Sequence, residues 1–187
     1  MPKGRATYAD IESLAEGLVG EIIDGELVVQ PRPRPAHAVL SAQLSGQLTL
    51  PFGAGRGGPG GWIFMIEPEL RFGPPGALDV LVPDLAAWRR DRMPILPEES
   101  AIRIVPDWVG EIISPSTSRY DRGPKREIYR REGVGHLWLI DLDAQSIEVF
   151  RRAAEHWLLV ETFLAPGVVR VEPFAAVELD LGLLFAR

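Results

Sequence analysis

Residues 106–141, PDWVGEIISPSTSRYDRGPKREIYRREGVGHLWLID, decide the fold of this chain. The apolar run WVGEII at 108–113 has the length and character of a buried central strand. Residues 124–132 are predicted to form a helix, because Pro124 suits a position near the start of a helix. Residues 136–142 form the next predicted strand. A helix between two central strands indicates a mixed sheet flanked by helices.

Hydrophobic periodicity and turn residues predict the rest of the chain. The Asp24-Gly25 dipeptide between apolar pairs is a strong hairpin signal. The expected fold class is α/β (α+β), a mixed β-sheet flanked by helices with an N-terminal helix and hairpin, in a single domain over 1–187 with its core at about 20–165. The further elements expected are helices at 7–18 and 36–50, a hairpin at 20–30, strands at 62–72, 77–88, 146–150 and 157–164, and loops at 53–61, 89–100 and 114–123.

Composition places the chain among globular proteins, with 46% hydrophobic and 25% charged residues. The absence of cysteine excludes disulfides and thiolate metal sites. Because no apolar run reaches about 18 residues and no secretory signal is found, we expect a cytoplasmic protein without a membrane partner. The net charge of −6 argues against a protein that coats nucleic acid without specificity, but it allows an enzyme with a local basic patch. Asparagine is absent and proline is frequent, which fits a thermophile or a GC-rich genome.

Glu111 stands inside the apolar run at 108–113, where an ionised carboxylate is costly unless it is paired, hydrogen-bonded or bound to a cation. A carboxylate at the wet end of the sheet, or one paired with arginine, is the alternative. Asp107 on the same strand lies about 13 Å away, too far to share one ion. Asp84 is the better second acid, because Pro83 indicates a strand end or bulge that can redirect the next side chain. An ordinary Pro-Asp turn is the alternative there.

Lys125 is one of two lysines among the 20 cationic residues. It falls in the first turn of the helix at 124–132, where the helix dipole disfavours a cation. It shares the most apolar face of that helix with Ile128 and Tyr129, so we expect its ammonium to point inward or along the sheet. A surface lysine that keeps its ammonium in water is the alternative.

Two carboxylates and one lysine together predict a phosphodiesterase site. The oxygen ligands of Asp84 and Glu111 suit Mg²⁺ (or Mn²⁺), which keeps several waters and binds phosphate oxygens. Such an ion can activate a water and neutralise charge on a scissile phosphate. Lys125 can position that water or stabilise the developing charge.

Several stretches of the sequence match a known family. These are EIIDGELVVQP (21–31), the helix with His37, VPDLAAW (82–88), residues 106–143 and IEVFRR (147–152). Over about residues 7–165 the chain resembles the Uma-type family, a branch of the PD-(D/E)XK nuclease superfamily whose members are classed as restriction endonucleases largely by inference from their fold. The resemblance implies a restriction-endonuclease-like fold with Asp84 as the first acid and Glu111 as the second. The motif lysine normally stands two residues after the glutamate, where this chain has Ile113, so the resemblance implies that Lys125 has taken this role.

Three further acids are accessory candidates for the site. Glu67 and Glu69 alternate with other residues on the strand at 62–72, and one of them can face the site as an extra ligand. Glu26 can do so from the hairpin.

Two residues near the predicted helices complete the accessory candidates. His37 matches a histidine common in the family and can sit at the cleft, although a histidine at a helix start more often caps or packs. Asp121 can hold Lys125 or cap its helix.

The function expected from these residues is a Mg²⁺-dependent endonuclease that hydrolyses DNA phosphodiester bonds. A catalytically idle scaffold of the same fold, which binds nucleic acid or protein, is the alternative, and the negative net charge favours it somewhat. A glycosidase-like hydrolase with paired carboxylates leaves Lys125 unexplained. DNA is thus the expected partner, and exposed edge strands are compatible with a homodimer.

Overall fold

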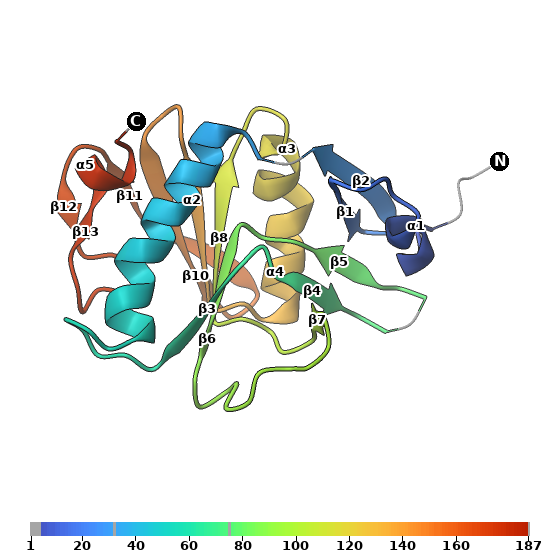
Figure 1. Cartoon of the computed structure of the whole chain (residues 1–187), viewed down its shortest axis with the longest axis horizontal. Helices are drawn as coiled ribbons and strands as arrows, with labels where there is room; N and C mark the ends of the chain where they lie inside the picture. Colours follow the sequence, from blue (N-terminus) through green and yellow to red (C-terminus); the bar gives the residue numbers. More distant parts are fainter. Residues whose placement is uncertain (1–4, 32, 75, 187) are drawn as a thin grey trace.

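Two β-sheets organise the protein in a computed structural model that describes residues 5–31, 33–74 and 76–186 (Figure 1). The six-stranded sheet has the order β11-β10-β9-β8-β6-β3, and the five-stranded sheet has the order β2-β1-β5-β4-β7. The first sheet consists of β3 (Trp62–Ile66), β6 (Leu85–Arg89), β8 (Trp108–Ile113), β9 (His136–Asp141), β10 (Ser146–Ala153) and β11 (His156–Leu164). The second consists of β1 (Leu18–Ile23), β2 (Glu26–Pro31), β4 (Glu69–Phe72), β5 (Asp79–Leu81) and β7 (Ala101–Ile102).

The helices lie outside and between these sheets. They are α1 (Tyr8–Glu12), α2 (Pro35–Leu48), α3 (Ser118–Tyr120), α4 (Arg126–Glu132) and α5 (Leu181–Leu184), with π-helical turns η1 (Thr49–Gly53) and η2 (Asp121–Lys125). A short pair, β12 (Val168–Val169) and β13 (Leu179–Asp180), precedes α5. None of the helices in the described segments has both the length and the apolar character needed to span a lipid bilayer.

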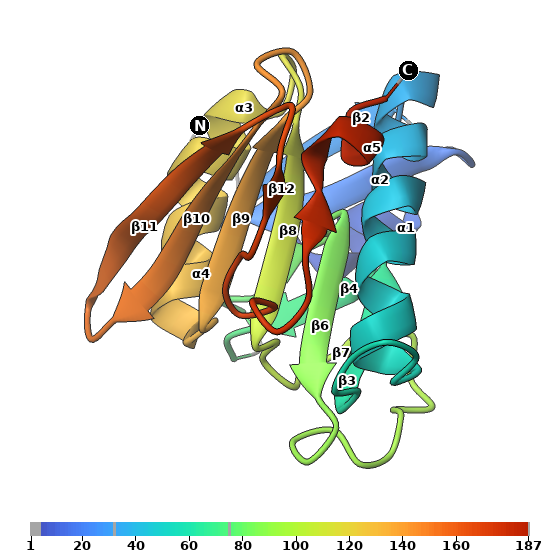
Figure 2. The same cartoon turned by 90° about the vertical axis from the view of Figure 1, so that its left-hand side faces the viewer.

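The central strand β8 divides the core into two layers. It pairs antiparallel with β6 and parallel with β9, and all of its residues are buried. Because side chains alternate along a strand, Trp108 and Ile112 pack on one face, against α2 and the C-terminal segment. Val109 and Ile113 pack on the other face, against α4 and the five-stranded sheet. Figure 2 shows α2 and α4 on opposite faces of the six-stranded sheet.

The predicted mixed sheet with a helical connection between its central strands is confirmed. The chain passes from β8 through α3, η2 and α4 into the parallel strand β9. The hairpin is also confirmed: β1 pairs antiparallel with β2, and its turn has positive φ at Asp24 and Gly25, as a type I′ turn requires. A mixed sheet with a helix beside its central strands is the framework on which the site is built.

The prediction of two long strands, at 62–72 and 77–88, is wrong in one respect. Each is two strands that belong to different sheets, β3 with β4 and β5 with β6. Pro68 and Pro83 lack the N–H that would continue a ladder, and Glu67 has a φ of 47°, so the chain turns at both places. Alternation of apolar residues indicates which side of a strand is buried, but it carries no signal for a change of sheet.

Helix boundaries also differ from the prediction. The helix expected at 7–18 ends at Glu12, and Gly17 has positive φ where the chain enters β1. The loop expected at 114–123 is largely helical, because a π-turn with a kink at Gly123 accommodates Pro124 and leads into α4. The predicted helix at 36–50 corresponds to α2 followed by η1.

A glycine in β8 generates a stability prediction. A Cβ added at Gly110 would lie 2.7 Å from Trp108 Cη2, and that indole is fully buried 5.1 Å from the ring of Trp138. We expect Gly110→Ala to lower the free energy of unfolding by about 1–3 kcal/mol, because the indole has no space to move into. Gly46→Ala is the matched control in α2: no atom lies within 4 Å of its added Cβ. This control should raise stability by about 0.5–1 kcal/mol. Urea unfolding of both variants tests this, and equal stability of Gly110→Ala and wild type would contradict it.

Candidate functional site

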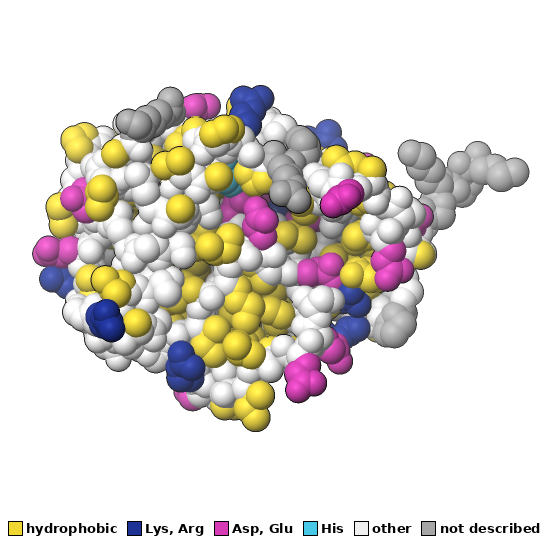
Figure 3. Space-filling model, in the orientation of Figure 1, with side chains coloured by type: hydrophobic (Ala, Val, Ile, Leu, Met, Phe, Trp, Pro, Cys, Tyr) yellow, Lys and Arg dark blue, Asp and Glu magenta, His cyan; other side chains and the backbone are white. Residues whose placement is uncertain are grey.

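A cleft of about 450 Å³ opens between the N-terminal hairpin with the start of α2 and the segment that follows β8. On the face drawn in Figure 3, acidic side chains and a histidine gather around a hollow. The predicted residues Asp84, Glu111 and Lys125 all line this cleft. Residues between 111 and 125 thus meet residues between 19 and 37, from the first third of the chain.

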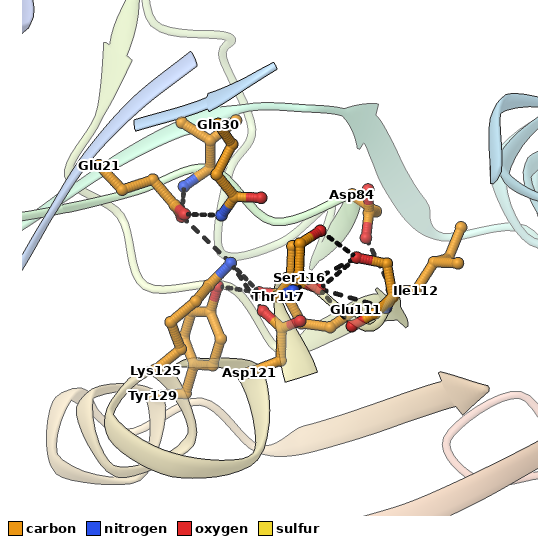
Figure 4. Close-up of polar contacts among 12 residues, drawn as sticks. Glu21, Gln30, Asp84, Glu111, Ile112, Ser116, Thr117, Asp121, Lys125 and Tyr129 are labelled. Atoms are coloured by element: carbon orange, nitrogen blue, oxygen red, sulfur yellow. Dashed lines mark hydrogen bonds and ion pairs between the residues drawn. The ribbon is translucent and has the colours of Figure 1, made fainter. Parts of the chain in front are cut away.

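Glu111 lies on the face of β8 that is turned toward α4, between the buried side chains of Val109 and Ile113. It is 2% exposed. Its Oε1 accepts a hydrogen bond from the Tyr129 hydroxyl at 2.6 Å and lies 2.8 Å from the Lys125 ammonium (Figure 4). Burial raises the pKa of Glu111 well above its ordinary value, and nearby carboxylates add to this against the opposing charge of Lys125.

Lys125 ends η2 and is also 2% exposed, so the alternative of a surface lysine is wrong. Its Nζ lies 3.1 Å from Glu21 Oε1 and 3.4 Å from Asp121 Oδ1, in addition to Glu111. The expected inward face is confirmed, because Ile128 and other side chains of that face are fully buried. Burial alone would lower the pKa of Lys125, but the surrounding carboxylates outweigh it and raise the pKa well above the ordinary value. The side chain therefore remains an ammonium.

Asp84 stands where the chain passes from β5 to β6, after the predicted break at Pro83. It directly precedes β6, which pairs with β8, and its Oδ2 accepts a hydrogen bond from the Ile112 N–H at 2.7 Å. Its Oδ1 lies 2.5 Å from His37 Nε2. Burial lowers the pKa of His37, but the hydrogen bond and charge of Asp84, with the charge of Glu67, reverse this and raise it. The hydrogen bond with His37 therefore fixes the position of Asp84 Oδ1, and the imidazole that makes it is readily protonated.

Glu21 is the site residue that the sequence analysis missed. It is buried on β1, where its Oε1 accepts the Val82 N–H at 2.8 Å and its Oε2 accepts from Gln30 Nε2 at 3.1 Å. Together with its contact to Lys125, these bonds fasten the hairpin to the cleft. Its sequence signal is the one used for Glu111, an acid inside an apolar strand. Tyr129, which orients Glu111, was seen only as an apolar neighbour of Lys125.

The accessory carboxylates divide into two groups. Glu67 is exposed but lines the cleft, and Asp121 lines it beside Lys125. Glu26 is exposed and does not line the cleft, because it stands opposite Ile23 at the turn end of the hairpin. Glu69 also lies outside it, where it pairs with Arg71 at 2.8 Å and accepts from a tyrosine hydroxyl.

Negative charge exceeds positive charge in the cleft. Four carboxylates, here called the acidic cluster, face one ammonium and one imidazole. With every group of this set ionised, two negative charges remain, which one divalent cation would balance. Within the described segments, no three His, Asp or Glu side chains converge closely enough to form a cation cage on their own. Mg²⁺ does not need one, since it usually binds one or two carboxylates and keeps several waters. The acidic cluster consists of Glu21, Asp84, Glu111 and Asp121.

Comparisons with known proteins identify the family and the fold of this chain. The model of the Uma2 family, described as "Putative restriction endonuclease", matches residues 6–183. Among solved structures, the crystal structure of "a putative nuclease belonging to DUF820" from Anabaena variabilis matches with a TM-score of 0.73 and 25% sequence identity. That match covers 96% of this chain and 97% of the other. The comparison with curated proteins found no match. The structural match over nearly the whole of both chains confirms the predicted restriction-endonuclease-like fold class.

The burial of Lys125 generates a second prediction. Lys125→Met should lower the free energy of unfolding by about 3–5 kcal/mol at neutral pH, because the buried carboxylates lose their cation. Arg119→Met, which removes an exposed cation from α3 of the same helical segment, should change stability little.

The pH dependence of this loss follows from the direction of the pKa shifts. Burial raises the pKa values of Glu111 and Asp121, so acid protonates them within the folded protein. The difference between wild type and Lys125→Met should therefore shrink as pH falls through the acidic range. Urea unfolding at several pH values measures it. A difference that grows toward acidic pH would contradict the assigned charges.

Proposed function

Because the chain belongs to the Uma2 family of restriction-endonuclease-like proteins, we propose that it is an endonuclease that uses Mg²⁺ or Mn²⁺ to hydrolyse phosphodiester bonds of DNA. The family and the structural neighbour together support a nuclease-like function. The observation that best supports the reaction is a buried ammonium, Lys125, held against Glu111 in the cleft that Asp84 also lines. A lysine beside two acids at the end of a cleft suits the hydrolysis of an anionic ester.

Asp84 and Glu111 are the residues that would hold the cation. Their carboxylates provide hard oxygen donors, and the excess negative charge of the acidic cluster favours a dication there. Both contacts of Glu111 fall on Oε1, and each oxygen of Asp84 has one protein partner, so lone pairs remain on both side chains. A bound divalent cation would neutralise charge on the phosphate and lower the pKa of a coordinated water.

Lys125 would act as a fixed positive charge and hydrogen-bond donor. Since its pKa is raised, it does not serve as a base at neutral pH. Its ammonium can orient a water or offset the charge that develops on the phosphate oxygens. Glu21 and Asp121 hold the ammonium in place from β1 and η2.

The acids themselves are oriented by neighbouring side chains. Tyr129 donates to Glu111, and the His37 ring bonds Asp84. Such supporting bonds fix the direction of metal-binding carboxylates.

A catalytically idle scaffold is the second candidate. The net charge of −6 and the acidic cleft favour it, since nucleic-acid-binding surfaces are usually basic. Cleavage activity separates the two candidates directly.

Removal of one metal-binding charge tests the cation site. Glu111→Gln keeps the shape of the side chain and an acceptor for Tyr129 but lacks the charge, so we expect Mn²⁺ binding to be lost. The fold should remain, because Lys125 retains two carboxylate partners. Isothermal calorimetry with Mn²⁺ measures the affinity, and circular dichroism measures the fold. Glu26→Gln, exposed outside the cleft, is the control and should bind Mn²⁺ like wild type. Unchanged affinity of Glu111→Gln would show that Glu111 is not a ligand.

Replacement of the ammonium by a guanidinium tests catalysis. Lys125→Arg keeps the charge but places a broad planar group in a site built for a compact one, so cleavage should fall by at least about tenfold while Mn²⁺ binding persists. The substrates are supercoiled plasmid and single-stranded circular DNA, which has no ends and therefore reports endonuclease activity. Arg119→Lys, an exposed exchange outside the cleft, should cleave like wild type. Full activity of Lys125→Arg would remove Lys125 from the mechanism. Absence of wild-type cleavage of DNA and RNA with every divalent ion would favour the scaffold.

A further inference from the structure

The cleft has walls on two sides of the candidate catalytic groups. One wall comes from β1, β2 and the start of α2, and the other from residues 114–117 and the turn between β9 and β10. Glu111 and Lys125 lie nearly fully buried at its base. A phosphodiester must therefore enter the cleft to reach them.

The volume of the cleft limits what can enter. At about 450 Å³ it falls in the range of about 300–1,000 Å³ that is typical of small-molecule pockets. Such a space holds one or two nucleotides. A duplex-binding surface is of another kind, since specific protein–DNA interfaces bury about 1,000–2,500 Å² of protein and are strongly basic.

The charges of the lining also disfavour a duplex. Duplex DNA carries one negative charge per about 1.7 Å of its axis, so binding normally requires many cations along the surface. Of the described lining residues, Arg34 is the exposed cation, whereas Lys125 is buried among carboxylates and His37 bonds Asp84. The lining contains six acids: Glu21, Glu67, Asp84, Glu111, Asp121 and Asp143. Such a lining can accept few phosphates.

The walls offer apolar surface for a base or a sugar. Val19, Pro33, Ala36, Pro115 and Leu142 line the cleft, and each is exposed or half-buried. Unpaired bases can pack on apolar side chains, whereas paired bases are stacked inside the duplex and cannot. The apolar walls therefore suit unpaired nucleotides.

We infer that the substrate is single-stranded DNA or an unpaired segment within a duplex, and that an intact duplex is excluded from the cleft. This inference rests on the proposed nuclease function. One or two nucleotides enter, the backbone phosphate reaches Glu111 and Lys125, and Arg34 contacts a neighbouring phosphate at the mouth.

The test incubates the full chain and Mn²⁺ with each of three DNA substrates that share one sequence. The substrates are a single strand, a fully paired duplex, and a duplex with a central unpaired segment. Sequencing gels locate the cuts. We expect cleavage of the single strand and of the unpaired segment only, with the paired duplex cut at least about a hundredfold more slowly, since pairing must first be disrupted. Fluorescence anisotropy with Ca²⁺ measures binding of the single strand and the paired duplex independently of cleavage.

Reversal of the charge of Arg34, at the mouth of the cleft, tests whether the single strand binds in the cleft. Arg34→Glu should weaken binding of the single strand by about tenfold, because one phosphate contact is lost and repulsion replaces it. Arg103→Glu makes the same charge change on an exposed residue outside the lining and should bind like wild type.

The outcomes distinguish this inference from the proposed function. Cuts within the paired duplex at a rate comparable to the single strand overturn the inference and leave the nuclease function intact. No cleavage of any substrate, with binding that is selective for the single strand and weakened by Arg34→Glu, supports the inference and overturns the nuclease function. Equal binding of the single strand and the duplex without cleavage overturns both. Single-strand binding that Arg34→Glu does not weaken overturns the inference, and the cleavage result alone then decides the nuclease function.

Discussion

The buried ammonium of Lys125 is the contact on which the site depends. Three carboxylates lie within 3.4 Å of it, and they come from β1, β8 and η2. None of these carboxylates could stay ionised in so dry a place without a cation, and the ammonium would not stay charged without them. The same cluster that holds the two sheets and the helical segment together therefore also positions the charged groups that line the cleft.

Much of the site could be predicted from local sequence, because each clue lies within a few residues. Glu111 conflicts with its apolar strand, Pro83 interrupts the strand before Asp84, and Lys125 lies on the apolar face of its helix. Each departs from the local pattern, and the structure shows that each departure leads into the cleft. The alternation of β8 also predicts which of its side chains face the helix.

The rest could not be predicted, because it depends on pairing between distant segments. Glu21 carries the same signal as Glu111, but nothing near it in the sequence shows that β1 lies beside β5 and brings its carboxylate to Lys125. The exchange of strands between sheets at Pro68 and Pro83 is equally invisible, since strands of both sheets carry buried apolar side chains. The sequence predicts Glu26 as the hairpin's accessory acid, whereas Glu21 is the hairpin acid that lines the cleft.

The hairpin that carries Glu21 is attached to the site by contacts between residues far apart in the sequence. Its contacts with Lys125 and Val82 join residues 104 and 61 positions apart, so closing these loops costs more chain entropy than forming local contacts, and we expect them to form after the local elements. In the native protein, small cooperative units open more often than the whole molecule. Release of β1 and β2 alone would free the ammonium from one of its partners and remove a wall of the cleft while β8 and β9 stayed paired. An intact cleft therefore requires that the N-terminal hairpin remain docked, in addition to an intact core.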